Sequence, residues 1–106
     1  MYFIVVKYDV KPESVEAWPQ IVKEFTDSTR AEDGNNFFEW SRSIEEPNVY
    51  YLVECFTDEG AGPHVSSDHF AAGLESMRPH LKHTPQIVSR QVDGTGWEPM
   101  GELQID

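Results

Sequence analysis

Residues 2–10, YFIVVKYDV, constrain the fold most strongly, because apolar side chains occupy both faces of this segment. The segment is rich in β-branched and aromatic residues, which favour a β-strand. Successive side chains of a strand point to opposite faces, so Val6 and Tyr8 lie on one face and Phe3 on the other. A strand that is apolar on both faces needs a cover on each. Helices of the same chain can cover one face, and a second copy of the chain is the simplest cover for the other.

A helix is predicted within residues 11–34, where apolar side chains such as Trp18 and Phe25 recur at helical spacing. Pro19 either kinks this helix or marks its first turn, and the sequence leaves both possibilities open. Gly34 is expected to end the helix, because glycine readily adopts the left-handed conformation found at helix ends.

The remaining segments predict two adjacent strands, a loop, a second helix and a fourth strand, at residues 35–48, 49–56, 57–64, 66–83 and 85–92. Within the third strand, Glu54 shares a face with apolar residues, where it either faces water or has a function. The order β-α-β-β-α-β is that of a ferredoxin-like α+β fold, an antiparallel sheet with both helices on one face. The bare sheet face again favours a homodimer.

The length of 106 residues predicts a single domain over residues 1–106, with a core at about 2–93 and a tail, 94–106, that can pack on a partner subunit. Nineteen acidic residues against eight basic ones give a formal net charge of −11, so neither nucleic acid nor an anionic membrane is an expected partner. Cys55 is the only cysteine, so the chain cannot form an internal disulfide and fits a reducing compartment. No apolar run reaches the roughly 18 residues of a membrane span, and no signal peptide is recognised. We therefore expect a cytoplasmic protein.

The segment HVSSDHF, residues 64–70, holds two of the four histidines. Zinc sites on one helix commonly use histidines four residues apart, which lie on the same face. His64 and His69 are five residues apart, or about 140° around a continuous helix, and no Cys-x-x-Cys motif supports them. The sequence therefore predicts no metal site.

Acid–base chemistry is the remaining possibility for these histidines. Ser66 or Ser67 is placed to cap the second helix, and no nucleophile elbow surrounds them. Histidine has an ordinary pKa near neutrality, so His64 or His69 at the edge of an apolar pocket could accept a phenolic proton. The alternative is that both histidines only pack and cap.

Three segments in order, TRAEDGN, VECFTD and HVSSDHF, resemble the antibiotic biosynthesis monooxygenase (ABM) domain family, including its quinol monooxygenases. The matching positions are Arg30, Glu32, Gly34, Glu54, Phe56, Asp58, His64, Ser67, His69 and Phe70. The resemblance extends over residues 2–93. It departs from the family pattern at Phe56, where a tryptophan is common, and at the GAGP segment before His64.

The resemblance implies a dimeric α+β barrel that oxidises a quinol, a polycyclic phenol or an anthrone with O₂ and with neither a metal nor a cofactor. His64 and His69 are then the candidate catalytic residues, as proton acceptors or hydrogen-bond partners of a phenol. The candidate substrate-binding residues are Trp40, Glu54, Phe56, Phe70 and Met77. The implied partners are a second copy of the chain, an aromatic small molecule and O₂.

Two other classes of function remain open, because a fold does not fix a function. One is a non-catalytic barrel that binds a small ligand. The other is an O₂-independent enzyme, an isomerase or hydrolase of a small metabolite.

Overall fold

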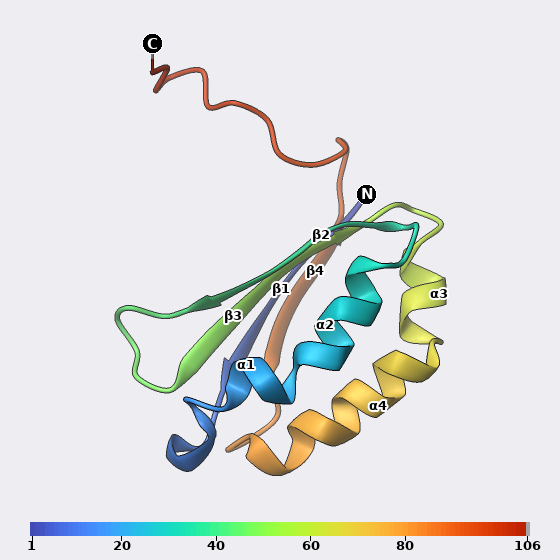
Figure 1. Cartoon of the computed structure of the whole chain (residues 1–106). Coiled ribbons are helices and arrows are strands. Elements are labelled where there is room, and N and C mark those ends of the chain that lie inside the picture. Colours follow the sequence, from blue (N-terminus) through green and yellow to red (C-terminus); the bar gives the residue numbers. More distant parts are fainter. Residues whose placement is uncertain (106) are drawn as a thin grey trace.

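The computed structural model describes residues 1–105 and confirms the ferredoxin-like α+β fold (Figure 1). Its four strands form one antiparallel sheet in the order β2-β3-β1-β4, with the helices on one face. The strands are β1 (Tyr2–Asp9), β2 (Asn35–Arg42), β3 (Val49–Phe56) and β4 (Gln86–Gln91). The α-helices are α1 (Trp18–Ile21), α2 (Lys23–Arg30), α3 (Ala61–Val65) and α4 (Asp68–Met77), with 3₁₀ turns at Pro12–Ser14 and Arg78–His80.

The alternation predicted for β1 is present. Val6 and Tyr8 are buried beneath the helices, whereas Phe3 is partly exposed on the open face of the sheet. Val6 pairs with Leu52 of β3, and Ile87 of the edge strand β4 pairs with Val6 from the other side. The register brings the same-face residues of the three strands together, so the core lies between the sheet and helices α1, α2 and α4.

The first helical segment is divided into short pieces. Pro19 lies in the first turn of α1, where its missing N–H costs no helical hydrogen bond, so it does not kink a longer helix. A break at Val22 separates α1 from α2, and Val22 itself is buried. Trp18 and Phe25 both enter the core, as their spacing predicts.

The expectation that Gly34 ends the helix in a left-handed conformation is wrong. Only Gly94 and Gly96 among the described glycines have positive φ. Gly34 is instead required because its backbone crosses that of Gly60, where an added Cβ would lie 2.4 Å from the Gly60 Cα. Thr57 N–H also donates to the Gly34 carbonyl over 2.8 Å. This crossing ties the turn after α2 to the segment that leads into α3.

The segment predicted as a loop, 57–64, partly forms the short helix α3, so that prediction is wrong there. Gly62 and Pro63 lie inside α3, and the sequence underestimates the helix because both residues usually interrupt helices. Ser67 caps the following helix α4, as one of the two predicted alternatives: its hydroxyl accepts a hydrogen bond from the Phe70 N–H at 3.1 Å. The cap separates the two helices and turns the chain between His64 and His69.

After β4 the chain leaves the body of the domain (Figure 1). Trp97 lies with its ring centroid 5.0 Å from that of Phe37, at the open face of the sheet. Among residues 1–105, no helix has both the length and the apolar character needed to cross a bilayer. Residue 106, which belongs to the predicted tail, lies outside the described residues.

Candidate functional site

A cavity of about 490 Å³ lies between the sheet and helix α4. Its lining is mainly apolar, with few polar groups, which is the usual composition of a small-molecule site. Glu54 and His64 are the buried polar residues of the lining, so they mark the inner end. Exposed residues of the lining, among them Arg78 and His83, mark the open end.

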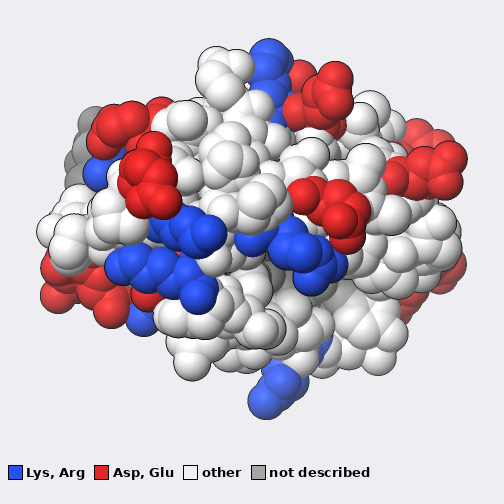
Figure 2. All heavy atoms as spheres, turned by 90° about the horizontal axis from the view of Figure 1, so that it is seen from below, with Lys and Arg blue, Asp and Glu red and all other residues white. Residues whose placement is uncertain are grey.

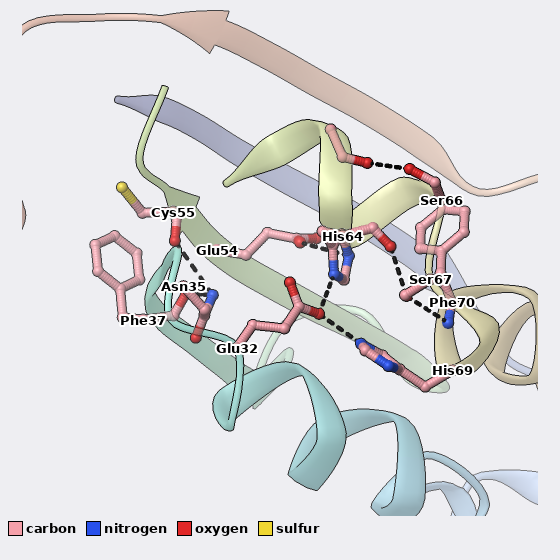
Figure 3. A network of polar contacts seen from close by, with 11 residues as sticks. Glu32, Asn35, Phe37, Glu54, Cys55, His64, Ser66, Ser67, His69 and Phe70 are labelled. Carbon is pink, nitrogen blue, oxygen red and sulfur yellow. Dashed lines mark hydrogen bonds and ion pairs between the residues drawn. The ribbon is translucent and has the colours of Figure 1, made fainter. Parts of the chain in front are cut away.

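The inner end of the cavity brings together two side chains from different elements. Glu54 comes from the middle of β3 and His64 from α3, and they are 6% and 3% exposed. The Oε1 atom of Glu54 lies 3.9 Å from Nε2 of His64 (Figure 3). This separation is beyond hydrogen-bond distance, so both atoms remain available to a ligand.

Glu32, in the turn after α2, holds both histidines of the HVSSDHF segment. Its Oε2 atom lies 2.8 Å from Nδ1 of His64 and 2.5 Å from Nε2 of His69 (Figure 3). A carboxylate only accepts hydrogen bonds, so Nδ1 of His64 carries a proton and donates it to Glu32. In the neutral ring, Nε2 is then the unprotonated nitrogen, and it faces the cavity.

Aromatic rings fix the orientation of His64. The ring centroid of Phe56 lies 4.4 Å from that of His64, and Phe70 packs edge-on at 5.1 Å. Phe25 of α2 contacts the same imidazole, with centroids 5.9 Å apart. Together with the hydrogen bond to Glu32, these contacts leave the imidazole one orientation.

Glu32, His64 and His69 are also the group of side chains that could hold a metal ion, because one donor atom of each lies within 4.8 Å of the others. Two histidines and a carboxylate suit zinc or iron. However, ligands at about 2.0–2.2 Å from a tetrahedral ion stand roughly 3.3 Å apart. The separations of 2.8 and 2.5 Å from Glu32 fit hydrogen bonds better. The absence of a metal therefore stays a prediction.

The spacing of the two histidines could not predict how they meet, because the angle of about 140° holds only on one continuous helix and the predicted helix begins at Ser66, after His64. His64 belongs to α3 and His69 to α4, and the turn at Ser67 lets both converge on Glu32. The side chain of His69 is 27% exposed and does not line the cavity. Its place is on the outer side of Glu32, facing solvent.

Burial, and then the nearby charge of Glu32, raise the pKa of Glu54 to about 8. Glu54 is therefore mainly a neutral carboxylic acid at neutral pH. Burial, followed by the charge of Glu54, also raises the pKa of the Tyr8 hydroxyl, which lines the cavity beside it.

The other predicted binding residues divide into two groups. Phe70 and Met77 of α4 line the cavity. Trp40 and Phe56 do not line it: Phe56 supports His64 from behind, and Trp40 packs against Trp18 with its indole N–H donated to Thr26 over 2.9 Å. The lining residues that sequence reasoning missed are Val6, Tyr8, Phe25, Leu74, Arg78, Leu81, His83, Thr84, Pro85 and Ile87.

The segment that carries the open end of the cavity, residues 78–85, lies at the foot of the molecule in Figure 1. Figure 2 views this end and shows Lys and Arg side chains near the middle of the face and Asp and Glu mainly toward its margins. Arg78 and Lys82 each face an acid, Glu75 at 3.2 Å and Asp9 at 3.6 Å. The open end thus has paired charges, whereas the inner end has unpaired polar atoms.

These features define a class: a ferredoxin-like α+β domain with an apolar ligand cavity under its helices and a histidine and a carboxyl group at the inner end. The chain belongs to the antibiotic biosynthesis monooxygenase family, whose model matches residues 1–76. Glu32, Glu54, His64 and His69 all lie within the matched residues. Family membership supports a monooxygenase-type or small-ligand-binding function. No curated protein matches this chain.

Solved structures agree with this fold. An antibiotic biosynthesis monooxygenase is 17% identical with a TM-score of 0.78, and the match covers 89% of this chain and 100% of that one. A conserved protein from Methanosarcina mazei is 22% identical with a TM-score of 0.79, covering 87% and 92%. Rv0793 from Mycobacterium tuberculosis is 16% identical with a TM-score of 0.77, covering 90% and 98%. At these identities the likeness shows the fold alone.

Proposed function

We propose that the protein is a cofactor-independent monooxygenase that oxidises a quinol, a polycyclic phenol or an anthrone with O₂. The observation that carries this proposal is the position of His64, whose unprotonated Nε2 faces an apolar cavity while Nδ1 is held by Glu32 at 2.8 Å. A general base needs this arrangement: an acceptor atom aimed at the substrate and a partner that orients the ring. The apolar lining suits a flat aromatic substrate.

The reaction requires no further reagent. His64 removes a phenolic proton, and the electron-rich anion passes an electron to O₂. The resulting radical pair combines to form a carbon–oxygen bond, and the O–O bond then breaks with loss of water. For a hydroquinone with a free ring position, the balance is quinol plus O₂ to hydroxyquinone plus water. The protein binds, deprotonates and positions the substrate.

Oxygen uptake tests this proposal. Purified protein treated with a chelator is expected to consume O₂ saturably with at least one member of a panel of naphthohydroquinones, anthrones and polycyclic phenols. Each rate is compared with autoxidation in the absence of protein. Uptake that never exceeds autoxidation across the panel, or uptake that the chelator removes, would contradict a metal-free monooxygenase.

We further propose that a second copy of the chain covers the open sheet face. This proposal is supported by apolar side chains exposed there: Val88 of β4, Phe3 of β1 and, beyond the strands, Trp97. The expected result is a dimer in sedimentation analysis at micromolar concentration, whereas a monomer at that concentration would contradict the proposal.

A reducing, cytoplasmic location is also proposed, since the one cysteine, Cys55, is free and buried.

A further inference from the structure

The carboxyl group of Glu54 lines the cavity without a hydrogen-bond partner among residues 1–105. Glu54 is 6% exposed, and its Oε1 atom lies 3.9 Å from Nε2 of His64, which is too far for a hydrogen bond. A buried polar group without a partner costs free energy, so such a group in a binding cavity points to a ligand that completes it.

The geometry defines where that ligand atom lies. Oε1 of Glu54 and Nε2 of His64 are 3.9 Å apart. An oxygen atom at about 2.8 Å from each, an ordinary hydrogen-bond distance, fits between them with an angle of roughly 90° at the oxygen. Both groups can therefore hold the same substrate oxygen.

The charges around Glu54 decide its form. Glu32, in the turn after α2, disfavours a second negative charge, and the Tyr8 hydroxyl on β1 is a neutral neighbour. His64 faces Glu54 from α3, and the Arg78 guanidinium and the His83 imidazole lie at the exposed, open end of the cavity. A carboxylic acid in such a site can donate a hydrogen bond to an oxyanion at neutral pH.

We propose that Glu54, as a neutral acid, donates a hydrogen bond to the oxygen that His64 deprotonates. The substrate proton moves from that oxygen to Nε2 of His64, and the Glu54 O–H keeps its own proton while it stabilises the anion. This inference rests on the proposed function for the reacting group. It narrows the substrates to aromatic phenols and enols with a free hydroxyl at the inner end, and it excludes their O-methyl ethers.

Binding of 4-nitrophenolate tests the role of Glu54 without any turnover. Over about pH 7.5 to about pH 10, wild-type affinity is expected to fall once Glu54 ionises, approaching about tenfold per pH unit above its pKa. Glu54→Gln keeps a hydrogen-bond donor but cannot ionise, so its affinity is expected to lose the part of this fall that Glu54 contributes, about tenfold per pH unit. Any fall that remains comes from the proton that Nε2 of His64 needs in order to donate to the anion. Glu54→Leu is expected to bind at least about tenfold more weakly near pH 7.

The matched control is Glu59→Gln, which removes an exposed acid outside the cavity and is expected to keep the wild-type pH dependence. The same fall in Glu54→Gln as in wild type, or equal binding by Glu54→Leu, would overturn the inference.

A second measurement uses the unaltered protein. The side-chain carboxyl ¹³C shift of Glu54 is expected to titrate near pH 8, and saturation with 4-nitrophenolate is expected to move the midpoint upward. An unchanged midpoint in the presence of bound 4-nitrophenolate would contradict the hydrogen bond. Neither measurement involves O₂, so a protein that binds the anion in this way but consumes no O₂ contradicts only the proposed oxidation.

Discussion

Gly60→Ala is expected to destabilise the domain by about 3 kcal/mol, because the new methyl group has no space. A Cβ at residue 60 would lie 2.7 Å from both the Cα and the carbonyl oxygen of Gly34, and 2.9 Å from Oγ1 of Thr57. The first two contacts are with backbone, which cannot rotate away. The expected measurement is a lower midpoint in urea denaturation, followed by far-UV circular dichroism.

Gly62→Ala is the matched control, two residues further along the chain. Nothing lies within 4 Å of a Cβ at that position, and the residue is inside α3. Alanine is favoured over glycine in a helix by up to about 1 kcal/mol, so this variant is expected to be stabilised slightly. Equal midpoints for the Gly60 and Gly62 variants would show that the crossing of Gly34 and Gly60 is not tight.

His64→Gln is expected to lower kcat of the proposed oxidation by roughly 10²–10⁴-fold, the usual contribution of a general base. Glutamine approximates the size of the imidazole and can still hydrogen bond to Glu32, but it cannot accept the substrate proton. The measurement is O₂ uptake with the best quinol of the panel, compared at saturating substrate so that kcat and KM are separated.

The control for this variant is His80→Gln. His80 bonds to Ser14 through Nδ1 at 2.8 Å and lies outside both the cavity and the Glu32 network, so its kcat is expected to stay within about twofold of wild type. A His64→Gln protein that folds and retains wild-type kcat would remove His64 as the base.

Much of the fold could be predicted from local patterns. The two-sided apolar character of β1 and the helical spacing of Trp18 and Phe25 depend on residues close in sequence. The strand formed as expected, and both side chains entered the core although the helix is divided at Val22. Ser67 as a cap follows from the same kind of rule. The alternation of side chains along β3 placed Glu54 on the same face as apolar residues. It did not decide whether Glu54 faces water, and the structure shows that it is buried.

The convergence of Glu32 with both histidines could not be predicted from spacing, because it depends on long-range contacts. Glu32 is 32 residues from His64 and 37 from His69, and the approach is set by the crossing of Gly34 and Gly60. The one sequence signal that could have identified Glu32 as a site residue was its position in TRAEDGN, a segment that resembles the family pattern.

The placement of Trp40 was missed for a related reason. An aromatic residue on the inner face of a strand can line a cavity or fill the core. Only the packing of Trp18 against Trp40 shows that Trp40 fills the core. Phe56 is similar, since His64 covers its ring and separates it from the cavity.

The most direct test of the account is the fate of the oxygen atoms when metal-free protein oxidises a naphthohydroquinone under ¹⁸O₂. The account predicts a hydroxyquinone that carries one ¹⁸O atom, with the other ¹⁸O atom in water, formed by the wild type and lost in His64→Gln. A product without ¹⁸O, or labelled product formed equally well by His64→Gln, would contradict a monooxygenase in which His64 is the base.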